Sequence, residues 1–111
     1  MSKKFCLALD LKNDAALIAE YEKQHQQVWS EIINSIKNSG IEKMEIHRAG
    51  NRLFMIMETN DNFSFHKKAM EDAANVVVQR WEALMWKYQQ ALPFAKDGEK
   101  WVLMDKIFEL I

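Results

Sequence analysis

The sequence predicts an α+β fold in which two helical regions cover one face of an antiparallel four-stranded sheet. Apolar residues alternate with a period of two in several short stretches, which indicates strands. Two longer stretches follow a helical period, and turn-forming residues separate the elements. The resulting order, β-α-β-β-α-β, is that of a ferredoxin-like sandwich.

The first strand and the first helical region come from residues 5–39. Apolar side chains alternate over residues 5–11, and the intervening Cys6 and Ala8 predict a strand that is covered on both faces. Asn13 or Asp14 can cap the helix that follows. A helical pattern then runs to about residue 39, where Gly40 supplies the stop signal.

A hairpin comes next. Two short apolar runs, residues 42–47 and 53–59, flank the turn-forming residues 49–51, which predicts two antiparallel strands. Residues 60–62 are polar and can cap the second helical region.

The second helical region is expected to extend to about residue 91, with a break near residues 72–75. Pro93 and Gly98 predict a loop, and residues 101–110 predict a last strand. Its apolar residues fall on both faces, so we expect a homodimer that packs sheet to sheet over the uncovered face.

Composition narrows the possible partners and the compartment. One domain spanning residues 1–111 is expected for this length. Lys and Arg total 15 against 16 Asp and Glu, so nothing indicates binding to nucleic acid or to an anionic membrane. The single cysteine, Cys6, excludes an internal disulfide, and we expect it to be a buried, inert thiol. No signal peptide or membrane span is recognised, so a cytoplasmic location is expected.

The first helical region carries an unusual apolar stripe. His25 lies inside the stripe, and Tyr21, His25 and Trp29 follow one another at intervals of four along one ridge of a continuous helix. A hydrogen-bonded core histidine with packing aromatics would produce this pattern. So would the wall of a carbohydrate pocket, with histidine available for proton transfer and tryptophan for stacking on a sugar ring.

The second helical region holds another candidate group. Gln79 or Arg80 could bind sugar hydroxyls and Trp81 could stack on the ring. Alternatively, Arg80 extends to solvent and Trp81 belongs to the core. The sequence has no His or Cys cluster with metal-ligand spacing, no glycine-rich phosphate loop, and no recognisable Ser-His-Asp arrangement.

Three stretches together resemble the L-rhamnose mutarotase family. Residues 20–32, EYEKQHQQVWSEI, resemble its opening helix; residues 50–54, GNRLF, its hairpin; and residues 78–81, VQRW, its second-helix motif. The resemblance covers nearly the whole chain. Ser30 stands where the family usually has Pro, Gln24 where an Arg is common, and Met44 where a Tyr is expected.

The resemblance implies a dimeric α/β barrel that interconverts the α and β anomers of a deoxy sugar such as L-rhamnose or L-fucose, without a cofactor. Tyr21 and His25 match the family's catalytic or sugar-contacting pair, and Trp81 matches its stacking tryptophan. Gln79 and Arg80 match the motif as further sugar contacts. The alternatives are a non-catalytic sugar-binding module and another dimeric α/β-barrel protein of the monooxygenase or haem-binding kind.

Overall fold

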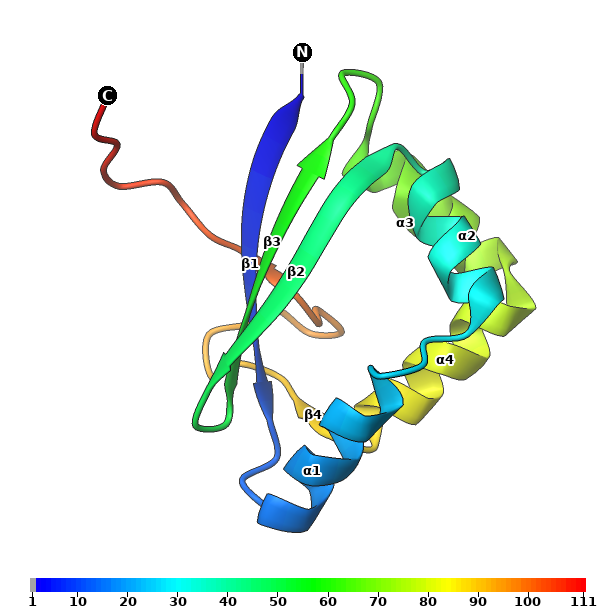
Figure 1. The fold of residues 1–111 in the computed structure, drawn as a ribbon, viewed down its shortest axis with the longest axis vertical. Coiled ribbons are helices and arrows are strands. Elements are labelled where there is room, and N and C mark those ends of the chain that lie inside the picture. The colour runs from blue at the N-terminus through cyan, green and yellow to red at the C-terminus, as the bar shows by residue number, and fades with distance from the viewer. Residues whose placement is uncertain (1) are drawn as a thin grey trace.

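The computed structural model describes residues 2–111, and an antiparallel sheet forms one of its two layers (Figure 1). The three long strands are β1 (Lys3–Leu11), β2 (Ile41–Ala49) and β3 (Arg52–Thr59). The strand order is β2-β3-β1-β4, which confirms the predicted α+β class. The outer edge of β1 is paired in two pieces, by β4 (Gln89–Gln90) at one end and by β5 (Val102–Leu103) near its middle.

Four helices form the second layer, and all of them lie on the same side of the sheet (Figure 1). They are α1 (Ala15–Gln24), α2 (Ser30–Asn38), α3 (Phe65–Ala74) and α4 (Val76–Trp86). Asp14 caps α1 by accepting from the Leu17 amide at 3.0 Å. Within residues 2–111, none of the helices combines the length and apolar character needed to cross a bilayer.

The expected continuous helix from residue 14 to residue 39 is wrong. The chain leaves the helix after Gln24 and resumes at Ser30, so the single ridge of Tyr21, His25 and Trp29 does not exist. After the break, the second half packs as α2 against both α4 and β2.

The second helical region breaks inside the expected interval, at Asn75. The Asn75 side chain accepts from the amides of Val77 and Val78 at 3.0 and 3.2 Å, so the residue that ends α3 also caps α4. Two details differ from the sequence prediction. Ser64, rather than residues 60–62, caps α3, and α4 ends at Trp86 rather than near residue 91.

The last strand is much shorter than expected. Only Val102–Leu103 pairs with β1, with one further bond from the Met104 amide to the Cys6 carbonyl at 2.8 Å. Residues 105–111 then leave the sheet and project away from the molecule (Figure 1). Apolar side chains on both faces of a strand need cover on two sides, and the described chain gives this segment none.

The core lies between the two layers and falls into two apolar clusters. One centres on Tyr21, Trp81 and Tyr88. The other joins the upper sheet to Phe63 through Leu7 and Met57. The opposite face of the sheet carries no helix, and four apolar side chains from β1 and β3 lie on it half-buried: Cys6, Ala8, Phe54 and Ile56.

Candidate active site

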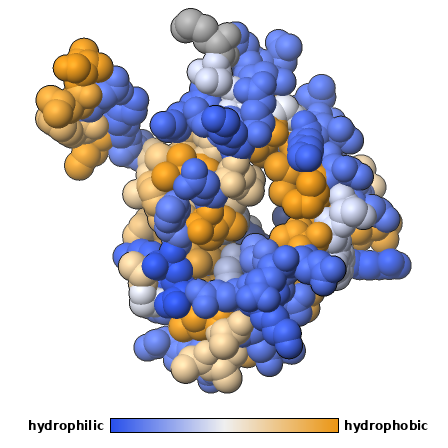
Figure 2. Space-filling view, in the orientation of Figure 1, coloured by the Kyte–Doolittle hydropathy of each residue, from blue (hydrophilic) through white to orange (hydrophobic). Residues whose placement is uncertain are grey.

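A cavity of about 650 Å³ separates the helices from the sheet. Figure 2 shows the hollow, with apolar side chains on both of its sides. Ile36, Ile46 and Trp101 pack against both core clusters and also line the cavity, so it lies where the two clusters meet. Its volume is within the range of about 300–1,000 Å³ that is usual for small-molecule sites.

His25 lies at the break between α1 and α2, on the wall of this cavity. It is the C-terminal capping residue of α1, and its Nδ1 lies 2.9 Å from the carbonyl oxygen of Tyr21. A carbonyl oxygen can only accept a hydrogen bond, so Nδ1 carries the hydrogen. The bond therefore fixes both the tautomer and the ring position, and it leaves Nε2 to exchange a proton with a ligand.

Tyr21 is nearly inaccessible, with 3% of its surface exposed, and it lines the same cavity. Its ring lies 4.4 Å from the His25 ring, centroid to centroid. Burial disfavours the phenolate and raises the pKa of Tyr21 to about 12, while a hydrogen bond with the Gln89 side chain opposes that rise. The phenol therefore keeps its proton at neutral pH and can act as a donor.

Trp81 completes the aromatic wall. Its indole is 5.8 Å from the His25 ring in an edge-on arrangement and lines the cavity. Trp29 does not line the cavity; it packs edge-on against Trp81 at 5.1 Å, with 38% of its surface exposed. Trp29 thus packs behind Trp81, outside the cavity, because the helix break separates it from the ridge of Tyr21.

Gln79 and Arg80 do not reach the cavity. Both are exposed on α4, and the Gln79 side chain donates to the carbonyl of Asp72 at 2.8 Å. Helical geometry explains the difference from Trp81. Val78, Trp81 and Met85 are spaced by three and four residues and share the face that lines the cavity, whereas residues 79 and 80 point elsewhere.

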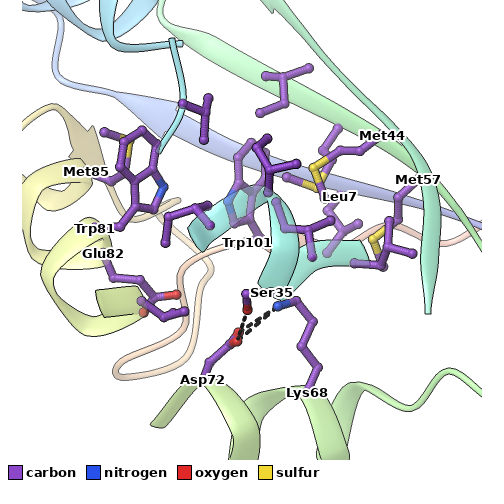
Figure 3. Close-up of a pocket in the computed structure, with 18 of the residues that line it drawn as sticks. Leu7, Ser35, Met44, Met57, Lys68, Asp72, Trp81, Glu82, Met85 and Trp101 are labelled. Carbon is purple, nitrogen blue, oxygen red and sulfur yellow. Dashed lines mark hydrogen bonds and ion pairs between the residues drawn. The ribbon is translucent and has the colours of Figure 1, made fainter. Parts of the chain in front are cut away.

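The sequence analysis missed several polar side chains in the lining. The ion pair between Lys68 and Asp72, at 2.9 Å, lies with Ser35 at one end of the space in Figure 3, facing Trp101 and the strand residues. Lys100 donates to the Glu82 carbonyl at 3.4 Å, and burial lowers its pKa. Lys100 is far from Lys68 and Asp72 in the sequence, and only the folded chain shows that all three line one cavity.

Gln89 is another residue that the sequence analysis missed. It is buried in β4 and lines the cavity beside Tyr21. The sequence analysis placed it inside a helix, where its neighbours gave no sign of a pocket. Among residues 2–111, no group of three or more His, Cys, Asp or Glu side chains is arranged to hold a metal ion.

Comparison with known proteins identifies the family. A sequence model described as L-rhamnose mutarotase matches residues 4–110. An L-fucose mutarotase from Xanthomonas campestris pv. campestris is 44% identical over 110 residues, which cover 97% of this chain and 88% of the relative. The chain belongs to the L-rhamnose mutarotase family. It is therefore an isomerase of the mutarotase type, which interconverts sugar anomers.

Two further mutarotases are similar to this chain. An L-rhamnose mutarotase from Mesorhizobium japonicum is 30% identical over 87 residues, covering 77% of each chain. The crystal structure of an L-rhamnose mutarotase from Formosa agariphila superposes with a TM-score of 0.72 at 19% identity, covering 98% of this chain and 99% of that one. The latter match supports the ferredoxin-like fold.

Met44 is the departure from the mutarotase pattern that the structure makes most informative. It lies on β2 and lines the cavity, opposite the helix layer (Figure 3). A thioether at this position gives the wall an apolar surface that has no hydroxyl to offer a ligand. Gln24 and Ser30, the other two departures, do not line the cavity.

Proposed function

We propose that this mutarotase acts on a 6-deoxy-L-hexose, with L-fucose as the preferred substrate, and that His25 and Tyr21 transfer the protons. The observation that carries the proposal is the His25 ring, fixed through Nδ1 by the Tyr21 carbonyl and placed on the cavity wall between Tyr21 and Trp81. Trp81 offers an indole on which the apolar C–H face of a sugar can rest.

In the proposed mechanism, His25 Nε2 removes the proton from the anomeric hydroxyl. The freed electron pair forms the C1 carbonyl, and the bond between C1 and the ring oxygen breaks. Tyr21 passes its proton to that oxygen, and its hydrogen bond with Gln89 steadies the resulting phenolate. The aldehyde turns about C1–C2 and closes on its other face, which returns both protons. No atom is gained or lost.

The identity of the sugar rests on the relatives and on one wall of the cavity. The relative named L-fucose mutarotase is 44% identical, whereas the one named L-rhamnose mutarotase is 30% identical. The two sugars differ in configuration at C2 and C4, so the hydroxyl contacts decide between them. Met44, on β2, lines the cavity and offers no hydroxyl contact there.

The test is an anomer-exchange measurement by saturation-transfer NMR over L-fucose, L-rhamnose and D-glucose. We expect the fastest exchange with L-fucose. His25→Ala should lower the rate by about 10²–10⁴-fold, which is the usual contribution of general acid–base catalysis. His47→Ala is the matched control, because His47 is exposed and pairs with Glu45. If His25→Ala kept full activity, His25 could not be the proton-transfer group.

We further propose a homodimer that packs through the uncovered sheet face. The half-buried apolar patch of Cys6, Ala8, Phe54 and Ile56 continues into the C-terminal segment through the bond between Met104 and Cys6. Ile107 and Phe108 of that segment are 95% and 76% exposed, which is costly unless a second copy covers them.

Sedimentation equilibrium tests the dimer. The full chain should sediment as two copies, and a chain ending at Met104 should shift toward one copy. A full-length monomer at micromolar concentration would refute the proposal.

We also propose that the enzyme works in the cytoplasm, where the free thiol of Cys6 stays reduced. Cell fractionation tests this location.

A further inference from the structure

Gln89 is a buried polar side chain whose hydrogen bonding the folded chain only half completes. It is 4% exposed in β4, opposite Leu11 of β1. Its Oε1 is the one buried side-chain oxygen or nitrogen among residues 2–111 that has no hydrogen-bond partner. Buried acceptors are satisfied in the great majority of cases, so an orphaned one needs an explanation.

The cavity supplies that explanation. Gln89 lines it together with Tyr21 and His25, so the residue with the unpaired oxygen belongs to the wall that carries the proton-transfer groups. Gln90, the next residue of β4, is exposed and does not line the cavity. Gln89 is therefore the residue of β4 on the ligand side.

The nitrogen end of the same amide constrains Tyr21. Gln89 hydrogen-bonds the Tyr21 hydroxyl, and an amide NH₂ can only donate. When Gln89 donates to the phenol oxygen, the phenol hydrogen must point to another acceptor. Tyr21 then presents a donor beside the free Gln89 Oε1, which is an acceptor.

This donor–acceptor pair fits a cyclic sugar. One sugar hydroxyl can give its hydrogen to Gln89 Oε1, while the ring oxygen of the same sugar accepts the Tyr21 hydrogen. Neither a carboxylate nor a carbonyl could satisfy Oε1, because neither has a hydrogen to give.

We propose that Gln89 is a specificity-determining residue that binds one sugar hydroxyl through Oε1 and aims the Tyr21 hydroxyl at the substrate. This inference rests on the proposed sugar mutarotase function and adds a contact to it. Sites that hydrogen-bond a substrate hydroxyl reject analogues that lack it, because the partner group is left buried and unpaired.

The experiment compares kcat/KM for L-fucose with that for its 2-, 3- and 4-deoxy derivatives, by anomer-exchange NMR. Wild-type protein should lose roughly 10- to 100-fold on one of the three, as expected for one unpaired buried group. Gln89→Met keeps the shape of the side chain and removes both hydrogen-bonding ends. It should lose activity on L-fucose and show little further loss on that same derivative.

Gln90→Met is the matched control, and it should keep the wild-type ratios. Circular dichroism and urea unfolding check that each variant is folded. If Gln89→Met does not fold, Gln89→Glu keeps an acceptor and should retain the wild-type preference among the deoxy sugars. The proposal is overturned if Gln89→Met keeps all three wild-type ratios, if Gln89→Glu loses the wild-type preference, or if wild-type protein treats all deoxy derivatives alike.

Failure of this proposal is distinct from failure of the proposed function. Wild-type exchange of L-fucose anomers above the uncatalysed rate tests the function alone. The ratio between parent and deoxy sugars, compared between wild type and Gln89→Met, tests the Gln89 contact. A purely structural role for Gln89 would lower the rates for all sugars by one common factor and leave the ratios unchanged.

Discussion

Tyr21→Phe should change how the stability of the protein depends on alkaline pH. The pKa of Tyr21 is raised from 10.0 to about 12 in the folded chain, because burial disfavours the phenolate. Between these two values the unfolded chain loses the Tyr21 proton while the folded chain holds it. The unfolded state then binds fewer protons, so the free energy of unfolding falls as pH rises.

The magnitude follows from the size of the shift. Two pKa units correspond to about 3 kcal/mol, which is present in full below pH 10 and lost as pH passes through 12. About half of it should be gone by about pH 11. Phenylalanine has no proton to lose, so Tyr21→Phe lacks this contribution at every pH.

The test is to measure the free energy of unfolding of both proteins in urea between about pH 8 and about pH 11. Other groups also titrate there, but they titrate in both proteins, so the difference between the two curves isolates Tyr21. Wild-type protein should lose about 1 kcal/mol more than the variant over this range. Parallel curves would show that the Tyr21 phenol is solvated in solution, contrary to its 3% exposure.

Two further substitutions test the fold and the wall of the cavity. Gly40→Ala should lower the free energy of unfolding by about 1–3 kcal/mol, because Gly40 has φ +104° and an added Cβ would lie 2.8 Å from Asn60 Oδ1. Urea unfolding should show a smaller loss for Gly50→Ala, where φ is +60° and nothing lies within 4 Å. Trp81→Phe should lower kcat/KM for anomer exchange by roughly fivefold to tenfold, whereas Arg80→Ala, on an exposed face of α4, should leave it unchanged. If the Trp81 and Arg80 variants lost kcat/KM equally, Arg80 would have to contact the sugar as well.

Much of the fold could be predicted because it depends on short-range patterns. Alternation defined β1, and the Gly50 turn defined the β2–β3 hairpin in its observed position. The stop at Gly40 is confirmed by its positive φ, which disfavours other residues. The second break was visible as well, since Asn75 is a strong capping residue.

What the sequence did not show depends on contacts between distant segments. The helical period continues through residues 25–29 with no glycine or proline, so nothing local marks the end of α1. Gln89 sits in a stretch without a breaker before Pro93, and only the pairing with Leu11 makes it a strand residue. Gln79 and Arg80 were predicted as sugar contacts from a sequence motif. They lie on an exposed face of α4, and only the packing of that helix shows this.

The missed helix break is itself part of the site. In a continuous helix the carbonyl of Tyr21 would be engaged along the helix axis by a single amide four residues later. At a helix end the last carbonyls are open to other donors. Here the Tyr21 carbonyl receives the His25 amide at a long 3.3 Å and the His25 Nδ1 at 2.9 Å. The irregular backbone therefore supplies the acceptor that orients the His25 ring, and Tyr21→Phe should keep that orientation while losing the phenol.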